Sequence, residues 1–76
     1  MNEQFLTRLR ELRAARGLTQ TQVARVLGVS QRTYSDYERG RLPMRGSHLI
    51  RLAALYGVSA DYLCGITEDP QPYAGS

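Results

Sequence analysis

Residues 19–40 read TQTQVARVLGVSQRTYSDYERG, and they contain the signals of two short helices joined by a tight turn. Thr19 and Gln22 fit a capping box, in which a Thr hydroxyl and a Gln side chain satisfy free backbone groups at a helix N-terminus. Gly28 suits the left-handed end of this helix, and Ser30 is a good N-cap for the next one. So short a link forces the helices to cross steeply, which predicts a helix-turn-helix unit.

The helix predicted after the turn, over residues 31–39, is the third in chain order, and it has an apolar face and a polar face. At about 100° per residue, Tyr34 and Tyr37 point inward. The opposite arc, roughly 140° wide, carries only polar side chains, namely Gln31, Arg32, Ser35, Asp36 and Arg39. Gln, Arg and carboxylate side chains can hydrogen-bond the edges of adenine, guanine and cytosine. Any amphipathic surface helix has this pattern, but the preceding capped helix and glycine turn favour a DNA-contacting helix.

The flanking segments predict three more helices. These are a first helix with Phe5, Leu9 and Leu12 on one face and Gly17 at its end, a fourth between Ser47 and Gly57, and a fifth that Ser59 caps. No segment alternates apolar and polar residues as a half-buried strand does. We therefore expect an all-α, compact five-helix bundle over residues 1–66. Residues 67–76, with two prolines and few apolar groups, predict a flexible tail.

Length and composition exclude several classes of protein. A chain of 76 residues, 42% of them apolar, has room for one small domain with a folded core. No apolar run approaches the roughly 18 residues that a membrane span requires, so we expect no membrane partner. The single cysteine, Cys64, excludes an intrachain disulfide and a cysteine zinc cluster, and it suits a reducing cytoplasm.

Charge is distributed unevenly along the chain. Ten arginines, no lysine and seven acidic residues give a net charge of +3. Through Arg51 the ten arginines face four acidic residues, so this part carries +6, whereas the remainder carries −3. A basic body with an acidic end suggests a polyanion partner on one face. A solvated arginine-rich surface is the alternative on charge alone.

Segments spread along the chain match the pattern of a known family. They are LRELR at 9–13, GLTQ at 17–20, QTQVA at 20–24, LGVS at 27–30, YSDYERG at 34–40, Leu52-Ala53, GVS at 57–59, DYL at 61–63 and Gly65. Over about residues 4–66 the chain thus resembles the Cro and phage-repressor type of helix-turn-helix regulators, the XRE family. The resemblance implies a lambda-repressor-like DNA-binding domain. Such a domain docks its third helix in the major groove, usually as a dimer on an inverted repeat.

The resemblance also implies roles for individual residues. Gln20 corresponds to the family glutamine that bonds a phosphate and braces the recognition helix. Gln31 and Arg32 correspond to the main base-contacting positions, and Ser35 and Asp36 to further groove-facing positions. The positions where the family places DNA-backbone contacts around the following loop correspond here to Arg39, Arg41 and Arg45.

Asp36 departs from the simplest expectation, because phosphates repel a carboxylate that faces DNA. Either Asp36 accepts a hydrogen bond from a cytosine, or it pairs with Arg32 one helical turn earlier. In the second case Arg32 is partly neutralised, and Gln31 becomes the principal base-contacting residue.

Other polar and aromatic residues are expected to be structural or solvated. The family pattern pairs Arg13 with Glu38 across the first and third helices, which predicts a structural ion pair. His48 lacks the partners that a metal site needs, so we expect it to be solvated or at most to touch a phosphate. Three residues lie on apolar stripes and are expected in the core: Tyr34, Tyr37 and Tyr56.

These observations predict a function class. With one histidine, the chain offers no Ser/His/Asp or Cys/His arrangement, so we expect no enzyme, no cofactor and no metal. We expect a sequence-specific, double-stranded DNA-binding transcriptional regulator, most simply a repressor. As a bacterial or phage protein, it would work in the cytoplasm, at the nucleoid when bound to DNA.

Apolar residues near the C-terminus exceed what one small core needs, so we expect a homodimer. The candidate interface residues are Leu55, Val58, Tyr62, Leu63 and Ile66. An alternative is a protein-interaction module, such as the antitoxin-like partner of a toxin, which would use these residues and the acidic tail to bind another protein. A nonspecific DNA binder is a third alternative. The mixed polar chemistry of residues 31–39 argues against it, since phosphate binding needs only cations.

Overall fold

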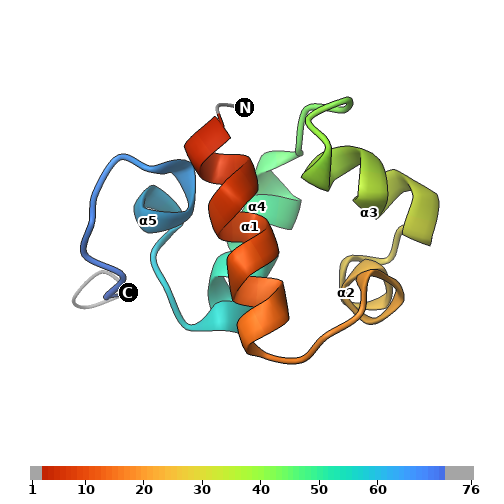
Figure 1. Cartoon of the computed structure of the whole chain (residues 1–76), viewed down its shortest axis with the longest axis horizontal. Coiled ribbons are helices and arrows are strands. Elements are labelled where there is room, and N and C mark those ends of the chain that lie inside the picture. The colour runs from red at the N-terminus through yellow and green to blue at the C-terminus, as the bar shows by residue number, and fades with distance from the viewer. Residues whose placement is uncertain (1–2, 72–76) are drawn as a thin grey trace.

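The computed structural model describes residues 3–71, which form five α-helices joined by short turns and loops (Figure 1). In chain order these are α1 (Glu3–Ala15), α2 (Gln20–Leu27), α3 (Gln31–Glu38), α4 (Gly46–Tyr56) and α5 (Ala60–Cys64). The predicted all-α, five-helix fold with a helix-turn-helix unit is confirmed. In this part of the chain, no helix combines the length and apolar character that crossing a membrane requires.

Helix α1 stands in the middle of the domain. Figure 1 shows α2 and α3 on one side of α1 and α5 with the following chain on the other, while α4 lies behind α1 in this view. Apolar side chains from all five helices meet in one core. The largest fully buried side chains are Tyr34, Tyr56, Phe5, Leu9, Leu52, Leu63 and Val23. Tyr37 is also buried, so the predicted core tyrosines are confirmed.

Two arginines of α1, and Arg16 directly after it, bind the C-terminal ends of three other helices. The last carbonyl groups of a helix have no intrahelical partner, and a positive charge near them interacts favourably with the helix dipole. Each arginine donates to one carbonyl in a last turn: Arg8 to Tyr62, Arg10 to Glu38 and Arg16 to Tyr56. Part of the basic excess that suggested a polyanion partner therefore has partners within the protein.

The ion pair expected between Arg13 on α1 and Glu38 on α3 is present. Arg13 Nε donates to Glu38 Oε2 at 2.6 Å, and Arg13 Nη2 donates to Glu38 Oε1 at 3.2 Å. Only 3% of the Glu38 side chain is exposed, against 21% of the Arg13 side chain. Arg13 Nη1 also donates to the Leu18 carbonyl at 3.0 Å. The guanidinium thus joins α1 to α3 and to the turn before α2.

Glu38 is ionised in the folded protein despite its burial. Burial by itself raises the pKa of this carboxyl, but hydrogen bonds from Arg13, Tyr34 and Gln20 outweigh it and hold the pKa below its ordinary value of 4.5. The Tyr34 hydroxyl donates to Glu38 Oε2 at 2.7 Å. Burial, with this hydrogen bond, raises the pKa of Tyr34.

One helix start differs from the prediction. Ser47 was expected to cap the fourth helix, but α4 begins at Gly46 and its N-cap is Arg45, which makes no side-chain cap hydrogen bond. The prediction was wrong because the N–H groups of His48 and Leu49 both bond the Arg45 carbonyl, which places Ser47 inside the first turn. The other predicted caps accept backbone hydrogen bonds as expected: Thr19, Ser30 and Ser59.

The segment after α5 lies against α1 and the start of α5. Its hydrogen bonds run from Arg8 to the Thr67 carbonyl at 3.1 Å, from Arg8 to the Glu68 carboxylate at 2.9 Å, and from the Ser59 N–H to the Pro70 carbonyl at 3.0 Å. The sequence predicts a flexible tail at 67–76. Residues 67–70 of that stretch are held by these contacts, and residues 72–76 lie outside the described residues.

The substitution Gly28→Ala tests whether the turn between α2 and α3 needs a residue with a positive φ. The Gly28 φ of +73° lies in the left-handed region, so we expect Gly28→Ala to lower the free energy of unfolding by about 1–2 kcal/mol. Gly46→Ala is the matched control, because both sites leave open space for a Cβ and only Gly28 has a positive φ. Urea unfolding checks both variants, and equal stabilities would contradict the turn's dependence on glycine.

Arg13→Met tests the buried ion pair. We expect the free energy of unfolding to fall by about 3–5 kcal/mol, because the substitution strands the Glu38 carboxylate in the interior. Arg16→Met is the comparison, since Arg16 is exposed and loses only one hydrogen bond to a carbonyl. A loss below about 1 kcal/mol for Arg13→Met, the value of an exposed pair, would contradict the account.

The lowered pKa of Glu38 makes stability depend on pH in a definite direction. In the unfolded chain Glu38 takes up its proton near pH 4.5, but in the folded protein only at lower pH. The unfolded state therefore binds more protons in this window, and the free energy of unfolding falls as pH drops below about 4.5. Urea unfolding from pH 7 to pH 3 measures the slope. Glu38→Gln is expected to have a shallower slope, and identical slopes would contradict this assignment.

Candidate nucleic-acid interface

Helix α3 turns its polar arc away from the core. Tyr34 and Tyr37 are buried on its inner side, where their rings meet edge to face with centroids 6.5 Å apart. The outer side has exposed side chains at both ends and half-buried ones between them. These are Gln31 and Arg32 at the start, Ser35 and Asp36 in the middle, and Arg39 at the C-cap. The polar arc therefore offers hydrogen-bond donors, acceptors and cations on one exposed face.

The turn before α3 fixes where this face begins. The left-handed Gly28 ends α2, and the Val29 N–H donates to the Ala24 carbonyl at 3.0 Å. The Ser30 hydroxyl oxygen then accepts from the Thr33 N–H at 3.1 Å, which caps α3. Gln31, the first residue of α3, consequently follows a short turn whose backbone hydrogen bonds are satisfied.

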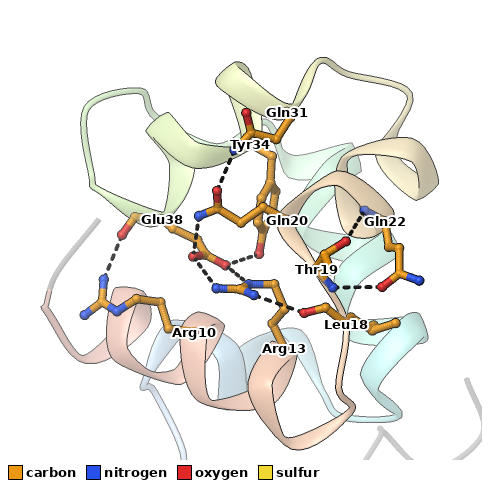
Figure 2. Close-up of polar contacts among 9 residues, drawn as sticks. All are labelled: Arg10, Arg13, Leu18, Thr19, Gln20, Gln22, Gln31, Tyr34 and Glu38. Carbon is orange, nitrogen blue, oxygen red and sulfur yellow. Dashed lines mark hydrogen bonds and ion pairs between the residues drawn. The ribbon is translucent and has the colours of Figure 1, made fainter.

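Two glutamine side chains connect the buried carboxylate to the start of α3. Gln20 Nε2 donates to Glu38 Oε1 at 3.1 Å, and Gln31 Nε2 donates to Gln20 Oε1 at 2.7 Å. Figure 2 shows Glu38, Gln20 and Gln31 in this order, with Arg13 and Tyr34 also bonded to the carboxylate. Gln20 thus bridges α2 and α3, as the resemblance implied for this position.

The link between Glu38 and Gln20 was not predicted from the sequence. Tyr34 and Glu38 are four residues apart, a spacing that places side chains next to each other on a helix. That spacing was a usable signal for the hydrogen bond between them. No comparable local signal connects Gln20 to Glu38, because the two lie on different helices and meet only through the packing of α2 against α3.

Arg32 and Asp36 form no ion pair with each other in the described part of the chain. The Arg32 side chain is exposed, and Asp36 is half-buried. The pairing that would have neutralised part of Arg32 is therefore absent from this structure. Arg32 presents its full charge and all its N–H groups on the outer side of α3.

Three exposed arginines follow the polar arc along the chain: Arg39, Arg41 and Arg45. Arg39 is the C-cap of α3, and Arg45 is the N-cap of α4. No side chain caps α4, and its His48 and Leu49 N–H groups bond the Arg45 carbonyl. The N–H groups of Gly46 and Ser47 therefore remain available next to Arg45. Helix N-termini with such groups attract anions.

His48 differs from its prediction. Its Nδ1 lies 2.9 Å from the Tyr37 hydroxyl, and the two rings meet with centroids 5.8 Å apart. The expectation of a solvated histidine was wrong, because the His48 ring is half-buried and contacts both the hydroxyl and the ring of Tyr37. His48 therefore helps to hold the loop between α3 and α4.

The candidate dimer residues fall into three exposure classes. Leu63 is fully buried within the domain core, so its side chain is not available to a second chain and the prediction for it was wrong. It belongs to the common core, and α5 packs against both α1 and α4. Ile66 is 74% exposed. The other candidates are half-buried: Leu55, Val58 and Tyr62.

Comparison with known proteins agrees with this architecture. Residues 4–63 match the family model described as a helix-turn-helix domain. The chain is 41% identical over 68 residues to the uncharacterized HTH-type transcriptional regulator YobD of Bacillus subtilis, covering 90% of this chain and 61% of YobD. It is 39% identical over 61 residues to the HTH-type transcriptional regulator ImmR of the same species, covering 80% of this chain and 48% of ImmR.

A phage protein has a similar match. The cryptic phage CTXphi transcriptional repressor RstR of Vibrio cholerae is 39% identical over 54 residues, covering 71% of this chain and 49% of RstR. The chain thus spans about half to three fifths of the length of these relatives. All three are named as transcriptional regulators or repressors, which agrees with the expectation of a regulator rather than an enzyme. The chain belongs to the helix-turn-helix family, in its phage-repressor or XRE branch.

Proposed function

We propose that this protein is a sequence-specific transcriptional regulator, most simply a repressor, that binds double-stranded DNA by placing α3 in the major groove. The observation that carries the proposal is the polar arc of α3, on which Gln31 is held in place by Gln20 and Arg32 remains exposed. A regulator of this kind works in the cytoplasm, where the bacterial or phage genome is accessible.

Gln31 and Arg32 are the proposed principal base-contacting residues. A glutamine side chain can bond adenine through two hydrogen bonds, and an arginine can bond guanine in the same way. Ser35 and Asp36 lie further along the same arc, where a hydroxyl and a carboxylate can accept from a base amino group such as cytosine N4. The absence of an ion pair between Asp36 and Arg32 supports a separate role for each.

Phosphate contacts are assigned to both ends of the helix-turn-helix unit. Gln20 lies at the first residue of α2, where the helix N-terminus favours an anion. On the other side, the arginines along the loop and the uncapped start of α4 suit a second stretch of DNA backbone. The phosphate-contacting residues of this proposal are Gln20, Arg39, Arg41 and Arg45. Such contacts set the position of α3, and base contacts then provide specificity.

We propose further that the protein binds as a homodimer on an inverted repeat. Leu55, Val58, Tyr62 and Ile66 supply apolar surface near the C-terminal end, on elements that follow the DNA-contacting ones. A two-fold axis there would set two copies of α3 one DNA turn apart, roughly 34 Å. The spacing would match half-site centres about 10 bp apart.

Selection of bound sites from a random duplex pool tests this function. At physiological salt, about 0.15 M, we expect enrichment of an inverted repeat with half-site centres about 10 bp apart. A folded protein that enriches no site would contradict the proposal, and it would favour a module whose main partner is another protein.

Two arginine variants separate base contacts from phosphate contacts. On the selected site, Arg32→Ala is expected to weaken binding by about 1–3 kcal/mol and to relax preference at one base pair. Arg41→Ala should weaken binding to all sequences alike and reduce the salt slope by about 1. Arg25→Ala, at an exposed arginine of α2 with no assigned DNA contact, is the control and should leave both quantities unchanged. Indistinguishable effects of Arg32→Ala and Arg41→Ala would contradict the assignment.

A further inference from the structure

We propose that Glu38 is a specificity-positioning residue: its buried carboxylate fixes the direction of the Gln20 and Gln31 amides, and so sets which hydrogen-bonding edge Gln31 presents to DNA. Glu38 itself is buried, so it acts through the side chains it contacts. The inference rests on the proposed function, because it concerns how a base is chosen by the same DNA-contacting helix.

The direction of the two amides follows from the chemistry of the carboxylate. An ionised carboxylate only accepts hydrogen bonds, so Gln20 must turn its Nε2 toward Glu38 Oε1, which it does at 3.1 Å. The Gln20 carbonyl oxygen then faces α3 and requires a donor. Gln31 Nε2 is that donor, at 2.7 Å. Turning the Gln20 amide over would place its oxygen against the carboxylate, and turning the Gln31 amide over would place its oxygen against the Gln20 oxygen.

This direction leaves Gln31 with a defined outward edge. One of its two N–H groups is bonded to Gln20. The second N–H and the acceptor Oε1 remain for a base, and this donor–acceptor pair matches the N7 acceptor and N6 amino group of adenine. A reversed Gln31 would instead bond Gln20 through its oxygen and present two N–H groups. Two donors match the N7 and O6 acceptors of guanine.

Glu38→Gln is expected to reverse the amides. Oε2 of Glu38 accepts from Arg13 Nε at 2.6 Å and from the Tyr34 hydroxyl at 2.7 Å, whereas the bond of Arg13 Nη2 to Oε1 is longer, at 3.2 Å. The oxygen of the new amide therefore stays in the place of Oε2, and the longer bond is lost. Its NH₂ group then occupies the place of Oε1 and faces Gln20. Gln20 must present its oxygen to this donor, and Gln31 must turn in response. The preference at the base pair that Gln31 contacts should shift from A·T toward G·C.

The test is a set of dissociation constants on the selected site and on versions with A·T replaced by G·C at each half-site position. Wild type should prefer A·T at one position, and Glu38→Gln should change that ratio of dissociation constants by about tenfold or more, the scale of one bidentate contact. Tyr34→Phe removes another hydrogen bond from the same carboxylate but leaves it charged. It should lose stability and keep the wild-type ratio.

A second variant keeps the test decisive if Glu38→Gln does not fold. Gln20→Leu removes the bridge without touching the ion pair, so Gln31 can turn either way and its A·T preference should fall toward equality. Gln22→Leu is the matched control on the same helix, because the Gln22 side chain accepts from the Thr19 N–H and has no link to Gln31. It should keep the wild-type ratio.

The outcomes separate this inference from the proposed function. A wild-type protein with no base preference at any position would contradict the proposed function, and this inference with it. A wild-type protein with clear preferences, whose ratio at every position survives both Glu38→Gln and Gln20→Leu, would overturn the role of Glu38 alone. A changed ratio confined to one position, with unchanged ratios in the two controls, supports it.

Discussion

The carboxylate of Glu38 accepts four hydrogen bonds in the interior of the domain, and the arrangement of the first three helices depends on it. Arg13 of α1 supplies two of them, Tyr34 of α3 a third and Gln20 of α2 a fourth. A buried charge is tolerated only when it is paired and hydrogen-bonded. The packing of α1, α2 and α3 must therefore keep all these donors in place together, which defines the position of α3 relative to the rest.

Arginine has two separate uses in this chain. The arginines of α1, and Arg16 directly after it, point to carbonyls and carboxylates of the domain itself, where they hold the ends of α3, α4 and α5. Those from Arg32 to Arg45 lie exposed on α3 and along the following loop. A count of charges does not distinguish the two groups, because the difference comes from which surface of each helix is packed. The ten arginines therefore do not all serve a polyanion partner, and four of the exposed ones lie on or next to the polar arc: Arg32, Arg39, Arg41 and Arg45.

Most of the fold was predictable because its signals are local. The capping box at Thr19, the left-handed Gly28 and the cap at Ser30 each depend on a few neighbouring residues, and each is present. The ion pair of Arg13 with Glu38 was predicted from the family resemblance together with the place of Glu38 beside the inward face of its helix. Contacts between distant segments were missed, including the hydrogen bond of Gln20 to Glu38 and the contact of His48 with Tyr37, because they depend on how helices pack. Ser47 shows the reverse error. Its local sequence predicted an N-cap, but α4 begins at Gly46 with Arg45 as its N-cap.

The central claim is that the core, through Gln20, holds Gln31 in one orientation before DNA binds. The side-chain amide NMR signals of the free protein test it most directly, with wild type compared to Gln20→Leu. The account predicts slow solvent exchange and separated amide proton shifts for Gln31 in wild type, changing to those of an exposed glutamine in Gln20→Leu, while the signals of Gln22 stay the same. Identical Gln31 signals in the two proteins would contradict it.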